Sequence, residues 1–329
     1  MAIAGCARQA PAPVPTPAAV VRDAEVRRIL TALAHDSMEG RRTGTPGADR
    51  AAAFIASEMN AIGVTAAGDS GFFQKVPFVV SPRRGVRLLG AMDSLSLIPP
   101  EDRRVSYNVI GYLGGSDPAL KDEVVVIGAH YDALGIRPAV NGDSIVNGAD
   151  DDASGVTAVL EIARALARGP APKRTIVFLL TTGEEQGILG TRWYVKEPAF
   201  PITQTVADIQ IEMIGRPDSL AGGSGKGWLT GYERSTMGEI LKAGNVPIVP
   251  DPYPAMRFFE RSDNIVFARL GIPAHTLSSY NLHKDYHTPG DDVDKIDFAH
   301  MTGVITAAVE AVRLLANGPT PQWKEGGRP

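Results

Sequence analysis

Two short apolar segments place the strongest constraint on how this chain can fold. Val124–Gly128 and Thr175–Thr181 lack the polar alternation that a half-exposed strand shows. A strand that is covered on both faces needs no such alternation, so each segment is predicted to be a buried strand of a parallel sheet. Ser154–Arg168 lies between them and carries apolar residues at helical spacing, which predicts a helix there.

The rest of the chain continues this alternation of strands and helices. Further strands are predicted at Val206–Ile214 and Ile272–Leu277, and in the first third at Phe72–Val80, Val86–Leu89, Leu95–Ile98 and Val105–Leu113. Helices are predicted at Val21–Asp36, Ala48–Ile62, Ser235–Ala243, Ser262–Arg269 and Phe298–Leu315. The pattern indicates an α/β fold, a three-layer α/β/α sandwich with a mixed, mainly parallel central sheet.

Composition excludes several classes of partner and site. With 329 residues, 44% of them apolar, the chain can bury a full-sized core. The net charge is −4 and basic runs are missing, so we expect no nucleic-acid partner. No apolar run approaches the roughly 20 residues that a membrane span needs. Cys6 is the only cysteine, so any metal must be held by histidines and carboxylates.

The first residues suggest a membrane anchor. Ile3–Cys6 resembles the bacterial lipobox, in which cleavage leaves a lipidated cysteine, and the Pro-rich segment Ala10–Pro17 has the composition of an extended tether. Lipidation of Cys6 would place the protein in a bacterial cell envelope, periplasmic, lipid-anchored or secreted. Because the basic and most of the apolar part of a signal are missing, a disordered tail with a free cysteine remains the alternative. We expect residues 21–320 to form one domain, residues 1–20 a disordered tether and 321–329 a tail.

Polar side chains follow both apolar segments at the point where each strand is expected to end. His130 and Asp132 come after the first, and Glu184 and Glu185 after the second. Ligand sites in open α/β sheets lie beyond the carboxyl ends of the strands. A metal-bound histidine commonly gives its other ring N–H to a carboxylate, which Asp132 could supply. Taken singly, these residues are equally compatible with a structural histidine and two solvated loop acids.

Three further residues could complete a metal site. Asp151 stands in an aspartate run before a predicted helix, where it is either a turn and cap residue or a bridging ligand. Glu212 interrupts an apolar segment, and a buried carboxylate needs a partner or a metal. His287 lies in the turn-rich stretch Tyr286–Asp292. The remaining histidines are interpreted as structural.

Taken together, these motifs resemble one family. The order GAHYD, GADDDASG, TTGEEQG, IEMIG and YHTPGDD is similar to that of the di-zinc aminopeptidases, which include bacterial leucyl aminopeptidase, plasma glutamate carboxypeptidase and glutaminyl cyclase. SMEGRRTGTPG and FFQKVPF resemble the N-terminal part of this family, and SDNIVFARLGIPA its C-terminal part. No long insertion separates Val80 from Val105, so we expect the protease-associated domain of some relatives to be absent.

The resemblance implies a role for each residue. Asp151 would bridge two zinc ions, with His130 and Glu212 on one and Glu185 and His287 on the other. The other assigned residues are Glu184 as general base, Asp132 as the partner of His130 and Tyr286 as an oxyanion contact. The family also implies a cis peptide after Asp151. Many members have aspartate in place of Glu212, whose extra methylene moves the carboxylate by about 1.5 Å.

The implied activity is hydrolysis of the N-terminal peptide bond of peptides, with two zinc ions, or cobalt or manganese in their place. A one-zinc glutaminyl cyclase and a non-catalytic binding module such as the transferrin receptor are the alternatives. Aromatic residues of the segment 222–261 are expected to favour apolar substrate side chains, although a core role is equally compatible with them; they are Trp228, Tyr232, Tyr253, Phe258 and Phe259. The sequence does not predict the oligomeric state.

Overall fold

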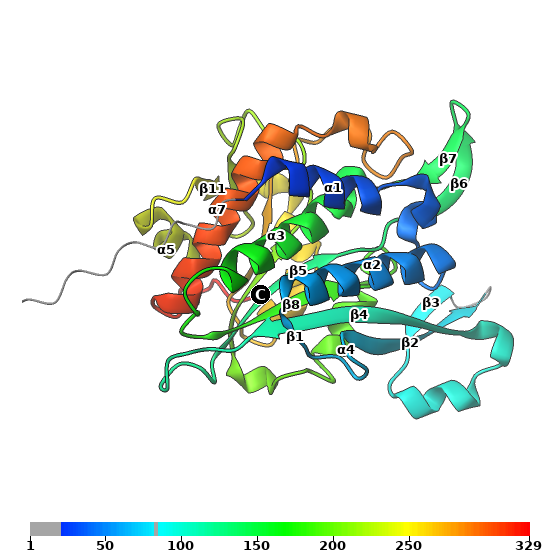
Figure 1. Cartoon of the computed structure of the whole chain (residues 1–329), viewed down its shortest axis with the longest axis horizontal. Coiled ribbons are helices and arrows are strands. Elements are labelled where there is room, and N and C mark those ends of the chain that lie inside the picture. The colour runs from blue at the N-terminus through cyan, green and yellow to red at the C-terminus, as the bar shows by residue number, and fades with distance from the viewer. Residues whose placement is uncertain (1–20, 82–84) are drawn as a thin grey trace, which may run out of the picture.

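A computed structural model describes residues 21–81 and 85–329 (Figure 1). Cys6, the lipobox-like start and the Pro-rich tether lie outside the described residues, so the predictions made for them stay predictions. The chain builds one large mixed sheet with the order β11-β10-β12-β9-β5-β8-β4-β2-β3, and β1 pairs with β4. This arrangement confirms the predicted α/β class.

Four parallel strands form the centre of the sheet, namely β5 (Val124–His130), β8 (Thr175–Thr181), β9 (Thr205–Ile211) and β12 (Ala274–Ser278). Antiparallel strands extend it on one side, β4 (Arg103–Leu113), β2 (Phe73–Ser81), β3 (Gly85–Leu88) and the short β1 (Thr65–Ala66). On the other side lie β10 (Gly227–Leu229), antiparallel to β12, and β11 (Ile248–Pro250). All residues of β5 and β8 are buried, as their unbroken apolar sequence predicts.

Helices cover both faces of the sheet. One face carries α1 (Asp23–Leu33), α2 (Pro46–Ile62), α3 (Gly155–Ala167) and α7 (Phe298–Asn317) (Figure 1). The other face carries the short α4 (Leu189–Tyr194) and α6 (Asn264–Arg269), while α5 (Met237–Ala243) packs beside β11 and α7. The layers are therefore helix, sheet, helix.

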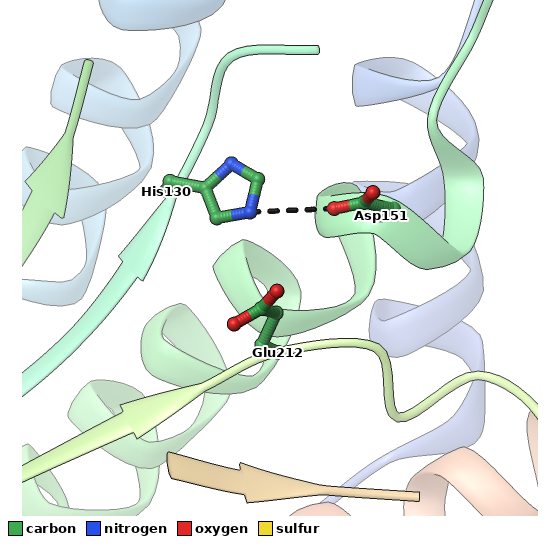
Figure 2. A group of neighbouring side chains, drawn as sticks. All are labelled: His130, Asp151 and Glu212. Carbon is green, nitrogen blue, oxygen red and sulfur yellow. Dashed lines mark ion pairs between the residues drawn. The ribbon is translucent and has the colours of Figure 1, made fainter. Parts of the chain in front are cut away.

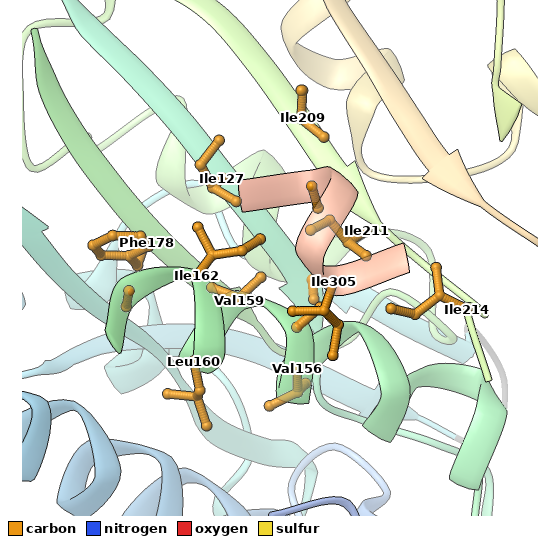
Figure 3. Close-up of a cluster of buried hydrophobic side chains, with 14 of the residues drawn as sticks. Ile127, Val156, Val159, Leu160, Ile162, Phe178, Ile209, Ile211, Ile214 and Ile305 are labelled. Atoms are coloured by element: carbon orange, nitrogen blue, oxygen red, sulfur yellow. The ribbon is translucent and has the colours of Figure 1, made fainter. Parts of the chain in front are cut away.

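Alternate residues of the central strands supply the two halves of the core. Ile127 and Phe178 point toward α3, where they meet Val159 and Ile162 (Figure 3). Their neighbours Val126 and Val177 point to the opposite face. Burying one such side chain contributes about 1.5–3 kcal/mol, so the central strands are fixed in register by apolar contacts on both sides.

Helix α7 is long and apolar enough by length and composition to cross a membrane, contrary to our expectation that no segment has that character. Within the fold it is a core helix, since 61% of its most apolar stretch is buried. Its N-terminus is capped by Asp297, whose carboxylate accepts a hydrogen bond of 3.0 Å from the backbone N–H of His300.

Two local predictions for the first half of the chain need correction. Leu95–Ile98 is not a strand, because Met92–Leu97 forms a 3₁₀ helix in which Leu97 is 83% exposed. The hairpin of β6 (Gly135–Val140) and β7 (Asp143–Val146) was not predicted, since its residues are mostly exposed and lack an apolar pattern. It projects from the body of the molecule (Figure 1).

Candidate metal centre

The carboxyl ends of three parallel strands bring the first candidate residues together. His130 is the last residue of β5, Glu212 directly follows β9, and Glu184 and Glu185 follow β8. Asp151 lies in the irregular turn Ala149–Ser154 that leads into α3. Strands that run in parallel end at the same edge of the sheet, so side chains far apart in the sequence meet there.

The five predicted metal ligands form two groups that share Asp151. His130, Asp151 and Glu212 offer ligand atoms within 4.8 Å of one another, and so do Asp151, Glu185 and His287. The Nε2 atom of His287 lies 3.2 Å from Oδ2 of Asp151 and 3.0 Å from Oε1 of Glu185. Figure 2 shows the side chains of the first group converging on one point.

Two atoms in the first group have no hydrogen-bond partner. Nε2 of His130 and Oδ1 of Asp151 are buried, lie 3.3 Å apart and form no hydrogen bond within the described residues. The Nδ1 atom of His130 lies 3.0 Å from the backbone oxygen of Asp132, which can only accept a hydrogen bond. Nδ1 therefore donates its proton there, and Nε2 is the ring nitrogen left to face the carboxylate of Asp151. A metal ion is a partner that could satisfy both buried atoms, so the residues fit a bound metal, and histidine with carboxylates is a donor set that suits zinc.

The crowding of carboxylates changes the ionisation of the group. Burial raises the pKa of Glu184 well above its usual range, and Glu212 raises it further. Burial also raises the pKa of Glu212, to about 7. Burial lowers the pKa of His287, but its hydrogen bonds to Asp151 and Glu185 raise it to about 10. Without a metal, the site thus takes up protons, which bound cations would displace.

The carboxylate of Asp132 has different contacts from those predicted. It lies 3.7 Å from Nδ1 of His130, farther than the backbone oxygen of the same residue. Its Oδ1 instead accepts a 3.1 Å hydrogen bond from the backbone N–H of Glu184, and its Oδ2 accepts one of 3.0 Å from the hydroxyl of Thr43. Asp132 therefore links the histidine at the end of β5 to the loop that carries Glu184.

Tyr286 lies against the second group. Its ring stacks on the imidazole of His287 with the ring centres 3.7 Å apart. Burial and the nearby carboxylates raise the pKa of its phenol, which remains protonated and able to donate a hydrogen bond. The peptide bond between Asp151 and Asp152 is cis, as predicted.

Several residues behind the ligands were not singled out from the sequence. The carboxylate of Asp291 accepts hydrogen bonds of 2.9 Å from the backbone N–H groups of both Asp150 and Asp151. His283, interpreted as structural, lies 3.0 Å from the carboxylate of Asp150. Asp291 belongs to the YHTPGDD motif, and that motif was the only signal for it in the sequence.

Arg41 was also missed, although it is fully buried behind the centre. Its guanidinium donates hydrogen bonds to backbone oxygens of Tyr131 (2.7 Å), Asn147 (2.7 Å), Gly148 (2.9 Å) and Leu33 (2.6 Å). Burial lowers its pKa to about 10, while nearby carboxylates, Asp291 first among them, oppose this change. One side chain thus joins the segment after His130 to the loop before Asp151.

A cavity of about 220 Å³ opens beside the candidate ligands. Its wall includes Trp228 and Phe258, two of the aromatic residues predicted to lie near the substrate, which stack with centroids 5.5 Å apart. Tyr253 packs against both of these rings. Phe259 instead belongs to the core, and Tyr232 packs on the outside of the core.

Comparison with known proteins finds aminopeptidases among the relatives of this chain. The chain is 28% identical over 220 residues to the probable leucine aminopeptidase 2 of Aspergillus fumigatus, covering 60% of this chain and 41% of that protein. Among solved structures, BSAP, a zinc aminopeptidase from Bacillus subtilis, has a TM-score of 0.67 at 15% identity over 91% of this chain and 96% of its own. The Legionella pneumophila LapA aminopeptidase has a TM-score of 0.63 at 20% identity, over 90% and 72%. The chain spans less than half the length of the curated relatives it matches, and the solved structures show a shared fold.

The predicted location in a bacterial cell envelope is wrong by these comparisons. The relatives include a vacuolar membrane protease of Tuber melanosporum, 28% identical over 213 residues, which covers 60% of this chain and 20% of that protein. Proteins with the same description from two Candida species also match. These relatives are named for a eukaryotic vacuole and not for a periplasm.

The family comparison covers the whole candidate centre. The model of peptidase family M28 matches residues 108–312, well over half of the chain. This range contains both groups that could hold a metal and the strands that position them. The chain therefore belongs to peptidase family M28.

Proposed function

We propose that this chain is a zinc-dependent aminopeptidase that uses two metal ions. The observation that carries the proposal is the pair of ligand groups meeting at Asp151. A carboxylate has enough lone pairs on its two oxygens to serve two cations. Its Oδ1 faces His130 and its Oδ2 faces His287, at 3.3 Å and 3.2 Å. The names of the M28 relatives support the same activity.

The residues that would hold the metals are His130, Asp151 and Glu212 for one ion, and Asp151, Glu185 and His287 for the other. When bound, such ions supply Lewis acidity toward the scissile carbonyl and toward water. Glu212 reaches the same point as His130 and Asp151, so the glutamate at this position is compatible with a complete ligand set.

Glu184 is the proposed general base. It lines the cavity, belongs to neither ligand group, and has its backbone held by Asp132. Its carboxylate accepts a proton from the attacking water as the water oxygen bonds to the carbonyl carbon. It then delivers this proton to the nitrogen of the leaving amine as the C–N bond breaks. Tyr286, which also lines the cavity, would donate its phenolic O–H in a hydrogen bond to the oxygen of that carbonyl.

The alternatives have less support. A one-zinc cyclase needs only one of the two groups, yet both have a full set of three residues. A binding module without catalysis has no need of a carboxyl group kept apart from the ligands, as Glu184 is. We therefore retain hydrolysis of the N-terminal peptide bond, with preference for apolar side chains that fit against Trp228 and Phe258.

A panel of aminoacyl chromogenic substrates tests the activity. We expect hydrolysis to be lost after dialysis against a chelator and restored by zinc, with leucyl or phenylalanyl substrates preferred over charged ones. Hydrolysis that persists in chelator, or no hydrolysis of any member with zinc present, would contradict the proposal.

Glu184→Gln tests the assignment of the base. The amide cannot accept the proton, so we expect kcat to fall by about 10²- to 10⁴-fold with zinc content unchanged. Glu239→Gln is the matched control, since Glu239 is exposed and pairs with Lys324 away from the site. A Glu184→Gln enzyme that keeps most of its activity would remove Glu184 from the mechanism.

A further inference from the structure

The cavity beside the candidate centre has one cationic side chain in its wall. Among the described residues that line it, Arg261 is the only lysine or arginine. Four carboxylates line the same cavity, and all four have an assigned task as proposed ligand or base; they are Asp151, Glu184, Glu185 and Glu212. Arg261 is therefore the only positive charge of the wall that is left for a substrate.

Arg261 has no acidic partner of its own. Within residues 21–81 and 85–329, no carboxylate oxygen lies within 4.0 Å of its guanidinium, and the other stretches contain no aspartate or glutamate. Its neighbour Arg257, by contrast, pairs with Glu260. Arg216 pairs with Asp285 at 2.8 Å. The charge of Arg261 is thus available at the cavity, whereas those of Arg257 and Arg216 are engaged.

Arg261 is exposed, and its guanidinium lies over an aromatic residue of the cavity wall. Its guanidinium carbon lies 5.2 Å from the ring centre of Phe258, which itself stacks on Trp228 in the cavity wall. The next residue, Ser262, is buried and lines the same cavity as Glu212. A stacked guanidinium keeps its planar fork of N–H donors free, and this fork matches the two oxygens of a carboxylate.

We propose that Arg261 binds a carboxylate of the substrate, so that peptides with a negative charge near the cleaved bond are preferred. This inference rests on the proposed peptidase function and adds a substrate class to it. The carboxylate has two possible sources, the C-terminus of a short peptide or an acidic side chain on the leaving residue. The contact stabilises the bound substrate and the transition state equally, so its loss should raise KM and leave kcat nearly unchanged.

Matched peptides separate the two sources. One pair is a dipeptide and its C-terminal amide, and the second pair is a dipeptide amide ending in glutamate or in glutamine. Each pair is assayed with the wild-type zinc enzyme, Arg261→Gln, Arg261→Lys and the control Arg257→Gln. The N-terminal residue is kept constant at the one that the chromogenic panel favours.

We expect the wild-type enzyme to prefer the charged member of at least one pair. The preference is the kcat/KM of the charged peptide divided by that of its uncharged partner. Arg261→Gln should lower this ratio by about 10- to 100-fold, the usual effect of losing a hydrogen bond to a charged group. Arg261→Lys should keep part of it, because a lysine retains the charge but loses the fork. Arg257→Gln should leave the preference unchanged.

Two results overturn the inference in different ways. Equal cleavage of both members of both pairs by the wild type, or a preference that survives Arg261→Gln, removes the role of Arg261 and leaves the peptidase proposal intact. Failure of the wild type to cleave any peptide overturns both proposals.

Discussion

Two buried histidines on the central sheet differ in a way that separates the metal centre from the core. His275 on β12 has both ring nitrogens satisfied, Nδ1 by the backbone oxygen of Thr230 and Nε2 by the hydroxyl of Ser235, each at 2.7 Å. Among the described residues, His130 at the end of β5 has a hydrogen-bond partner for Nδ1 but none for Nε2. Burial alone therefore does not indicate that a histidine is a metal ligand. A ring nitrogen without a hydrogen-bond partner that faces a carboxylate does indicate it.

The same contrast holds for two buried arginines at opposite ends of β5 and β8. Arg174, directly before β8, has a carboxylate partner, Glu123, at 2.6 Å and binds backbone oxygens at the end of α7. Among the described residues, Arg41 binds only backbone oxygens, three of them in the segments that carry His130 and Asp151 and the fourth, that of Leu33, at the end of α1. At the end of the sheet near Arg174, the buried positive charge is paired with a carboxylate. At the end near Arg41, the carboxylates remain available to bind a metal.

The largest expected effect comes from exchanging each histidine for asparagine. Loss of a residue that only orients a metal ligand already costs about 10- to 100-fold in metal affinity, so His130→Asn, which removes a proposed ligand, should weaken zinc binding by more than about 100-fold. His275→Asn should lower the free energy of unfolding and leave zinc affinity unchanged. Competition with a chromophoric chelator measures both affinities. Equal zinc affinity in the two variants would contradict the assignment of His130 to the metal centre and of His275 to the core.

The pH dependence of unfolding gives the second test. Burial lowers the pKa of His275 to about 4, so the unfolded state, with an ordinary histidine pKa near 6.5, binds more protons between these values. The contribution of His275 to stability is therefore complete above about pH 6.5 and is lost as the pH falls toward 4, with about 2 kcal/mol lost at pH 5.

Urea unfolding at pH 7.5 and pH 5, in chelator so that release of zinc adds nothing, measures this loss. The wild type should lose about 2 kcal/mol more than His275→Asn between the two pH values. A loss of equal size in both proteins would show that His275 does not titrate as its surroundings imply.

Replacing each of the two arginines by methionine should have the smallest effect on zinc affinity. Arg41→Met removes the link between the segments that carry His130 and Asp151, so zinc should bind about 10- to 100-fold more weakly. Arg174→Met is the matched control, a buried arginine whose loss should lower stability alone. Chelator competition at a temperature where both variants are folded separates the two effects. If Arg174→Met lowered zinc affinity as much as Arg41→Met, the position of Arg41 behind the centre would have no special meaning.

The candidate positions at strand ends could be predicted, but the choice of ligands came from the resemblance to the di-zinc aminopeptidases. An apolar run identifies β5 and β8, and parallel strands bring their carboxyl ends to one edge, so His130 and Glu185 were expected near each other. Glu212 was recognisable because it interrupts an apolar segment, whereas Asp151 and His287 depended on the order of the motifs. These signals are local to each strand, although the site they form is not.

The supporting residues could not be predicted for the opposite reason. Arg41 contacts Gly148 across 107 positions of sequence, and Asp291 contacts Asp150 across 141. Nothing in the immediate surroundings of Arg41 in the sequence distinguishes it from the exposed Arg50. The failure at Leu95–Ile98 has a simpler cause, since an apolar stretch of four residues fits a strand and a short 3₁₀ helix equally well.

Anomalous diffraction at the zinc absorption edge, from crystals grown with zinc, tests the central claim most directly. We predict two peaks, one within ligand distance of His130, Asp151 and Glu212, the other within ligand distance of Asp151, Glu185 and His287. A single peak, or peaks that do not share Asp151, would contradict the two-metal centre.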